Sequence, residues 1–137
     1  MKNTIENSLK SLITSQFPKT QMDVFHKGLV VLQVFNQSDV KNWSFDIPLN
    51  EEGGIVLNLF FNKNKKNNKE NYSRFEESPF FKDFIFVELN RGKIKSFYSP
   101  IPRATPIGEI ARMINTIISK VYQIGPGEPL DILVRAF

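Results

Sequence analysis

The sequence predicts a single α+β domain with an antiparallel sheet of about five to six strands. An N-terminal helix and a long second helix at about 106–123 are expected on one face of this sheet, followed by a final C-terminal strand. Two observations predict this class. Short apolar stretches separated by turn residues are typical of hairpin-linked strands, and apolar residues recur at helical spacing in two places. A chain of 137 residues fits one domain.

The first element is a short helix. Its apolar residues follow the spacing of one helical face, at Ile5, Leu9, Leu12 and Ile13. Asn3 is the candidate N-cap, and Glu6 stands three residues later, where its side chain reaches back to the cap. Pro18 marks the end of the helix or lies just beyond it.

Three strands are predicted next. Residues 28–35 are almost wholly apolar, which is typical of an interior strand. Residues 42–49 alternate between apolar and polar, which indicates a half-exposed strand, and Pro48 places it at an edge or at its end. Residues 51–54 form a turn, and 55–62 form the return strand of a hairpin.

The stretch "NKNKKNNKEN", residues 62–71, predicts an exposed loop because Asn and Lys are well solvated and bury little surface. It carries four Lys against one Glu, and so holds three of the four net positive charges of the chain. Residues 72–81 fit either a short helix or a loop. The basic character of the protein is therefore one local feature.

The second half begins with a hairpin, in which residues 83–89 pair with 93–98 across a turn at Gly92. The Pro-rich residues 99–106 predict an extended connector.

The long second helix has the strongest pattern in the chain. Thr105 is the expected N-cap, Pro106 the first helical residue and Gly125 the C-terminal cap. Between them lies a continuous apolar stripe, formed by Ile107, Ile110, Ala111, Ile114, Ile117, Ile118 and Val121. The final strand then covers 130–137.

Catalytic chemistry has few candidate residues. The chain has no Cys, so thiolate catalysis, disulfides and Cys-based metal sites are excluded. His26 is the only histidine, and it stands before a predicted strand without a nucleophile motif. We therefore expect no enzyme activity, no metal and no cofactor. The longest apolar run is too short to span a membrane, and the expected location is the cytoplasm.

The expected function is a non-enzymatic protein-binding module, such as an adaptor, a chaperone or a small structural subunit of a larger intracellular assembly. The order of helix, strands and helix resembles that of small secretion chaperones, which carry a further helix mid-chain where this chain has its Lys/Asn stretch. The partner is another protein or a second copy of the chain. Its expected contacts are Trp43, Tyr72, Phe75 and Phe137.

Two alternatives remain open. A nucleic-acid-associated protein would use the Lys residues of the basic stretch, which are Lys63, Lys65, Lys66 and Lys69. A small-ligand or enzyme site would need four charged residues to converge on an anion, namely Arg103, Arg112, Asp131 and Arg135. If they do not converge, they form surface ion pairs of small energetic weight.

Overall fold

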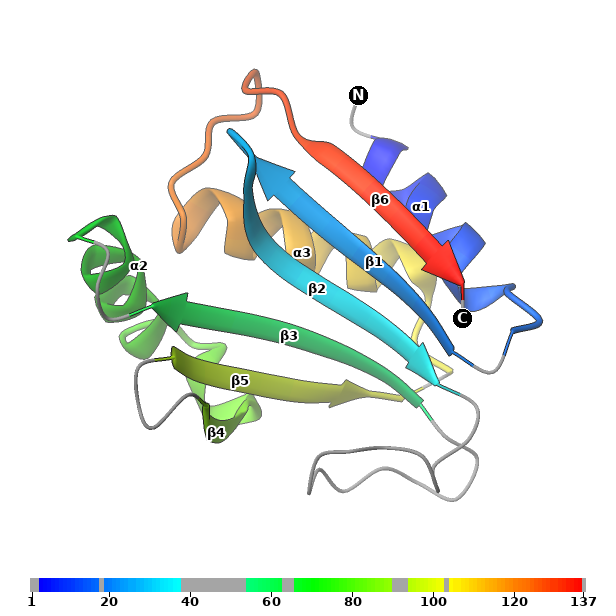
Figure 1. The fold of residues 1–137 in the computed structure, drawn as a ribbon, viewed down its shortest axis with the longest axis horizontal. Helices are drawn as coiled ribbons and strands as arrows, with labels where there is room; N and C mark the ends of the chain where they lie inside the picture. Colours follow the sequence, from blue (N-terminus) through cyan, green and yellow to red (C-terminus); the bar gives the residue numbers. More distant parts are fainter. Residues whose placement is uncertain are drawn as a thin grey trace.

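A computed structural model describes residues 3–17, 19–37, 54–62, 66–89, 94–102 and 104–136. These residues form an α+β domain, as the sequence predicts (Figure 1). The elements in chain order are α1 (Asn3–Ile13), β1 (Lys19–His26), β2 (Leu29–Gln37), β3 (Gly54–Asn62), α2 (Lys66–Glu76), β4 (Ile85–Leu89), β5 (Ile94–Ile101), α3 (Ile107–Lys120) and β6 (Asp131–Ala136). A short 3-10 turn, Phe81–Asp83, precedes β4.

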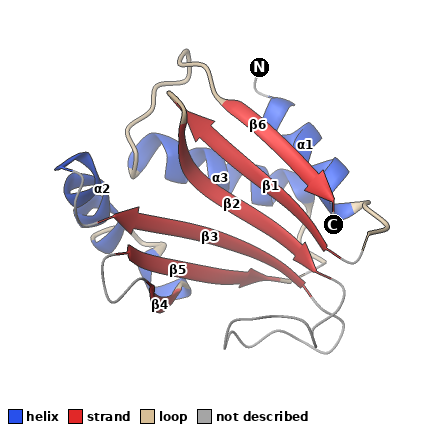
Figure 2. Ribbon diagram, viewed as in Figure 1, coloured by secondary structure: helices blue, strands red, loops and turns tan. Residues whose placement is uncertain are grey.

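The described strands form one six-stranded sheet in the order β4-β5-β3-β2-β1-β6. Every neighbouring pair is antiparallel. The strand β6 pairs with β1, so the first and last strands of the described chain lie side by side at one edge of the sheet (Figure 1). Both α1 and α3 lie on the same face of the sheet, which confirms the predicted layering (Figure 2).

The main core lies between the sheet and these two helices. Helix α1 contributes Ile5, Leu9 and Leu12, and α3 contributes the buried stripe Ile110, Ala111, Ile114, Ile117 and Ile118. Alternate residues of each strand face this layer, because side chains alternate along a strand. The strands contribute Met22, Val24, Leu32, Val34, Leu57 and Leu59.

The C-terminal end of α3 differs from the prediction. Gln123, rather than Gly125, takes the left-handed conformation, with φ of 54°. The Ile124 N–H donates to the Ile118 carbonyl at 3.1 Å, so the chain folds back over the last turn of the helix. The helix therefore ends earlier than the predicted residue 123.

The strand β1 is an addition to the prediction, which left residues 19–26 unassigned. The predicted strand 42–49 lies outside the described residues. The turn predicted at 51–54 is described only at Gly54, which is the first residue of β3. The strand β5 continues to Ile101, into the stretch expected to be a connector, and Pro100 stands opposite Val56 of β3 in the ladder.

The Lys/Asn-rich stretch is helical from Lys66 onward, which corrects the expected loop. The helix α2 is held to the domain by Phe75, which is fully buried and packs on Phe61 and Phe97 at centroid distances of 5.5 and 4.9 Å. The Arg74 Nε donates to the Val121 carbonyl at 2.7 Å and so links α2 to the end of α3.

Candidate functional site: a polar row and the edge strand beside it

A row of polar side chains crosses the face of the sheet opposite α1 and α3. Asp23 of β1 stands directly opposite Gln33 of β2, Gln33 opposite Asn58 of β3, and Asn58 opposite Tyr98 of β5. Their neighbours along the strands, such as Met22 and Val34, belong to the main core, so the row itself points the other way. We refer to Asp23, Gln33 and Asn58 as the polar row.

Hydrogen bonds run along the row from strand to strand. The Asp23 Oδ1 accepts from Gln33 Nε2 at 2.8 Å and from Gln21 Nε2 at 2.8 Å. The Gln33 Oε1 then accepts from Asn58 Nδ2 at 3.1 Å. The Asn58 Oδ1 is buried and has no hydrogen-bond partner within the described part of the chain. Three strands are therefore joined by side chains as well as by their ladders.

The carboxylate of Asp23 is buried and is neutralised from β6. Its Oδ2 accepts from the Arg135 Nη2 at 2.7 Å, and the side chains are 3% and 46% exposed, respectively. A buried charge is costly unless it is paired and hydrogen-bonded, and here both oxygens have donors. Arg135 therefore has a structural task, because it fixes β6 against β1.

This arrangement does not favour acid–base chemistry. General acid–base catalysis needs a titratable group within reach of a substrate proton, and both oxygens of Asp23 already accept hydrogen bonds from this chain. Within the described ranges, no group of three His, Cys, Asp or Glu is placed to hold a metal ion. The polar row is a network of hydrogen bonds between strands. Its solvent-exposed end is Arg135 on β6.

The strand β6 is the outermost strand on its side of the sheet. Asp131, Leu133 and Arg135 are exposed, and they alternate with the half-buried Ile132 and Val134, which pack on the main core. Leu133 stands opposite Asp23 and is 46% exposed, so the edge strand carries an apolar side chain that is open to solvent. We refer to Asp131, Leu133 and Arg135 as the β6 edge.

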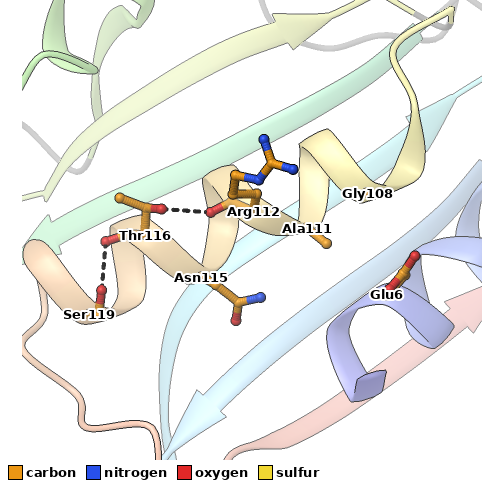
Figure 3. A pocket seen from close by; sticks show the side chains of 7 residues that line it. All are labelled: Glu6, Gly108, Ala111, Arg112, Asn115, Thr116 and Ser119. Atoms are coloured by element: carbon orange, nitrogen blue, oxygen red, sulfur yellow. Dashed lines mark hydrogen bonds between the residues drawn. The ribbon is translucent and has the colours of Figure 1, made fainter. Parts of the chain in front are cut away.

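A second feature is a groove of about 570 Å³ on the helix side of the molecule (Figure 3). Its lining comes from α1 and α3: Glu6, Gly108, Ala111, Arg112, Asn115, Thr116 and Ser119. The Thr116 and Ser119 hydroxyls donate to helix carbonyls at 2.8 and 3.2 Å, so their protons are already used. Figure 3 shows the Arg112 guanidinium and the Glu6 carboxylate on different sides of α3, so the two charges do not converge.

The predicted anion site is not assembled by its described members. Arg112 lies on α3, whereas Asp131 and Arg135 belong to the face on the other side of the sheet. Arg103 lies outside the described residues. Arg135 instead pairs with Asp23.

The predicted partner contacts have different fates. Phe75 is corrected to a core residue, because its ring is fully buried. Tyr72 is half-buried, with the Lys95 Nζ at 4.3 Å from its ring centroid. Trp43 and Phe137 lie outside the described residues.

The four lysines of the basic stretch are described only in part. Lys69 is exposed on α2, and Lys66 begins that helix. Lys63 and Lys65 fall outside the described ranges.

A contact that the sequence did not reveal joins His26, at the end of β1, to the turn before β6. The His26 Nε2 lies 3.1 Å from the Glu128 Oε1, and the Gly125 N–H donates to Glu128 Oε2 at 2.7 Å. The backbone hydrogen bond from Gly125, with a smaller contribution from His26, lowers the pKa of the Glu128 carboxyl. His26 thus links the end of β1 to the turn that precedes β6.

No protein-family model, curated protein or solved structure matches this chain significantly. In the described ranges, no helix is long and apolar enough to cross a membrane.

Proposed function

We propose that the protein is a non-enzymatic protein-binding module, such as an adaptor, a chaperone or a small structural subunit, and that it binds its partner along β6. The observation that carries this proposal is the position of β6. It is the last strand of the sheet, paired only with β1 among the described strands, and it carries an exposed Leu133. An extended segment that adds to such an edge gains main-chain hydrogen bonds, and alternate side chains give specificity.

Side-chain contacts also fix β6 to the rest of the domain. Ile132 and Val134 pack on the main core, and Arg135 is joined to the buried Asp23. A partner would therefore meet a strand that is already ordered, which lowers the entropic cost of binding. The three exposed side chains of the β6 edge offer an acidic, an apolar and a basic contact in succession.

The order of the elements supports a chaperone within this class. With α2 present, the described chain has the mid-chain helix that the resemblance to small secretion chaperones requires. This is a likeness of element order, and it adds to the proposal without identifying a substrate.

The test is the capture of a partner from the native cells by the tagged protein, compared between two variants. Leu133→Asp places a charge on the β6 edge, and Phe86→Asp places one on β4 at the opposite end of the sheet, where Phe86 is 47% exposed. We expect Leu133→Asp to weaken the captured complex by about tenfold or more, equivalent to about 1.4 kcal/mol, and Phe86→Asp to leave it unchanged. Equal capture by both variants contradicts the proposal.

A further inference from the structure

We infer that the occupant of the β6 edge is a second copy of this chain. In this arrangement, which rests on the proposed use of β6, two β6 strands pair antiparallel about a two-fold axis at Leu133. The sheet then continues from one copy into the other. The argument comes from the residue pattern of β6, its exposure and the flank of α1 beside it.

The residues of β6 are complementary to themselves. With Leu133 on the two-fold axis, antiparallel pairing sets Asp131 of one copy opposite Arg135 of the other, twice. It also sets Ile132 opposite Val134, twice, and Leu133 opposite its own equivalent. Opposite charges and apolar pairs at directly opposed positions are the contacts that stabilise a pair of strands.

The faces of the strand agree with this register. Asp131, Leu133 and Arg135 are exposed and share one face, whereas Ile132 and Val134 face the helix layer. The pairing therefore places both charge pairs and the Leu133 contact together on one side. A shift of the register by two residues would set Asp131 opposite Leu133 and lose both charge pairs.

The other edge strand lacks this property. The sequence of β4 is IFVEL, and its only charged residue is Glu88. Pairing of two β4 strands about their centre would set Glu88 opposite Phe86, with no charge of opposite sign on the strand. The charge pattern therefore favours self-pairing of β6 over self-pairing of β4.

Arg135 keeps an exposed side chain although it already bonds to Asp23. Its guanidinium has five N–H donors in a planar fork, and the bond to Asp23 is made by Nη2. The side chain is 46% exposed, so a carboxylate on a neighbouring strand can reach it. Asp131 lies at the other end of the same face and is also exposed.

The helix behind β6 presents a low-volume flank to this edge. Glu6 of α1 lines the groove toward α3. At 3.6 residues per turn, Ser8 and Ser11 lie on a different side of α1 from Glu6. Small side chains at these positions let two α1 helices come close when the strands pair.

The position of Leu133 on the axis gives a specific test. In the dimer, Leu133→Asp places two carboxylates opposite each other, and Leu133→Lys places two ammonium groups opposite each other. Each variant alone should therefore repel itself. In a mixture of the two variants, an Asp from one copy lies opposite a Lys from the other. We expect the unmodified protein to form dimers in sedimentation equilibrium, each variant to raise the dissociation constant at least tenfold, and the equimolar mixture to recover dimers.

Phe86→Asp is the matched control, because Phe86 and Leu133 are 47% and 46% exposed on opposite edges of the sheet. It should dimerise like the unmodified protein. Asp131→Arg, at an exposed position, is the independent second variant, and it should also dissociate the dimer because it opposes two Arg residues. A thermal melt of every variant checks that the fold is kept.

Three results would overturn the inference: a monomer at all concentrations, a dimer that Leu133→Asp and Asp131→Arg leave intact, or no recovery in the mixture. If the protein is monomeric but Leu133→Asp still abolishes capture of a different partner, self-pairing is wrong and the proposed function stands. If dimers form through β6 but capture does not depend on Leu133, the inference holds and the edge serves assembly alone.

Discussion

The Arg135 guanidinium holds the buried Asp23 carboxylate at 2.7 Å across 112 positions of sequence. Arg135→Gln removes this charge-assisted hydrogen bond and leaves the carboxylate buried. Hydrogen bonds to charged groups contribute about 1.5–3 kcal/mol, so we expect a loss of that size in the free energy of unfolding. The measurement is denaturant unfolding of Leu133→Asp with and without Arg135→Gln, so that self-association does not contribute.

Arg112→Gln is the control for this prediction, since it makes the same chemical change at an exposed position on α3. It should alter the free energy of unfolding by no more than about 0.5 kcal/mol. Equal losses in the two variants would mean that Arg135 does not stabilise the sheet through Asp23.

Helix α2 should be an integral part of the domain. Phe75→Ala empties a fully buried position among Phe61, Phe81, Phe84 and Phe97, and we expect a loss of about 3–5 kcal/mol. Lys69→Ala, on the exposed side of the same helix, should stay within about 0.5 kcal/mol. Chemical denaturation measures both, and a Phe75→Ala variant as stable as the parent would show that α2 does not pack on the sheet.

All three tyrosines should ionise at a higher pH than a free tyrosine does. Burial is the main cause that raises the pKa of Tyr72, Tyr98 and Tyr122, and Glu76 raises that of Tyr72 further, whereas a hydrogen bond with Ser96 partly offsets the rise for Tyr98. Because the folded pKa values lie above the ordinary value of about 10, this contribution to stability is complete below that pH and is lost as pH rises. A spectrophotometric titration of phenolate should show midpoints above 10 in the native protein and near 10 in denaturant. A native tyrosine that titrates at or below 10 contradicts the packing.

Glu128 should make the free energy of unfolding fall in acid. Its pKa is lowered first by the Gly125 backbone hydrogen bond and then by His26, so its contribution is present above the ordinary carboxyl pKa and is lost as pH falls through the lowered value. Glu128→Gln should therefore be less stable than the parent at neutral pH, with the difference shrinking in acid. His26→Asn should remove less of this dependence than Glu128→Gln does. Unfolding curves over a pH series would show about equal losses of this dependence in the two variants if His26 were the main cause.

The elements that the sequence predicted are those whose apolar pattern is complete in itself. Ile110, Ile114 and Ile117 of α3 repeat at helical spacing, and each is buried as that spacing requires. The hairpin of β4 and β5 and the strand β3 follow from apolar runs bounded by turns. In these segments the local preference and the final packing agree.

The strand β1 and the helix α2 depend on residues elsewhere in the chain. Gln21 and Asp23 interrupt the apolar pattern of β1, and they become acceptable in a buried strand only because Gln33 and Arg135 bond to Asp23. The residues Lys66–Glu76 have little helical pattern of their own, and Phe75 holds them through rings on other strands. Tertiary contacts decide both segments.

The sequence predicts some residues of the candidate site but not their neighbours. The sequence predicts that Asp131 and Arg135 of the final strand lie close to Arg103 and Arg112. The pairing of β6 with β1 decides the true neighbour, Asp23, and a contact between residues so far apart has no local signal in a single sequence.

The pairing of β1 with β6 also has a consequence for biosynthesis. The meander of β1, β2 and β3 can begin to form as soon as residue 62 has left the ribosome, whereas β6 starts only at Asp131. Until then the outer edge of β1 lacks the strand that pairs with it, and the Asp23 carboxylate lacks the Arg135 guanidinium. Exposed strand edges recruit other chains, so this interval is when the protein is most vulnerable to aggregation. Slowing translation between residues 62 and 131 should lower the soluble yield, and a chaperone that caps the β1 edge should restore it.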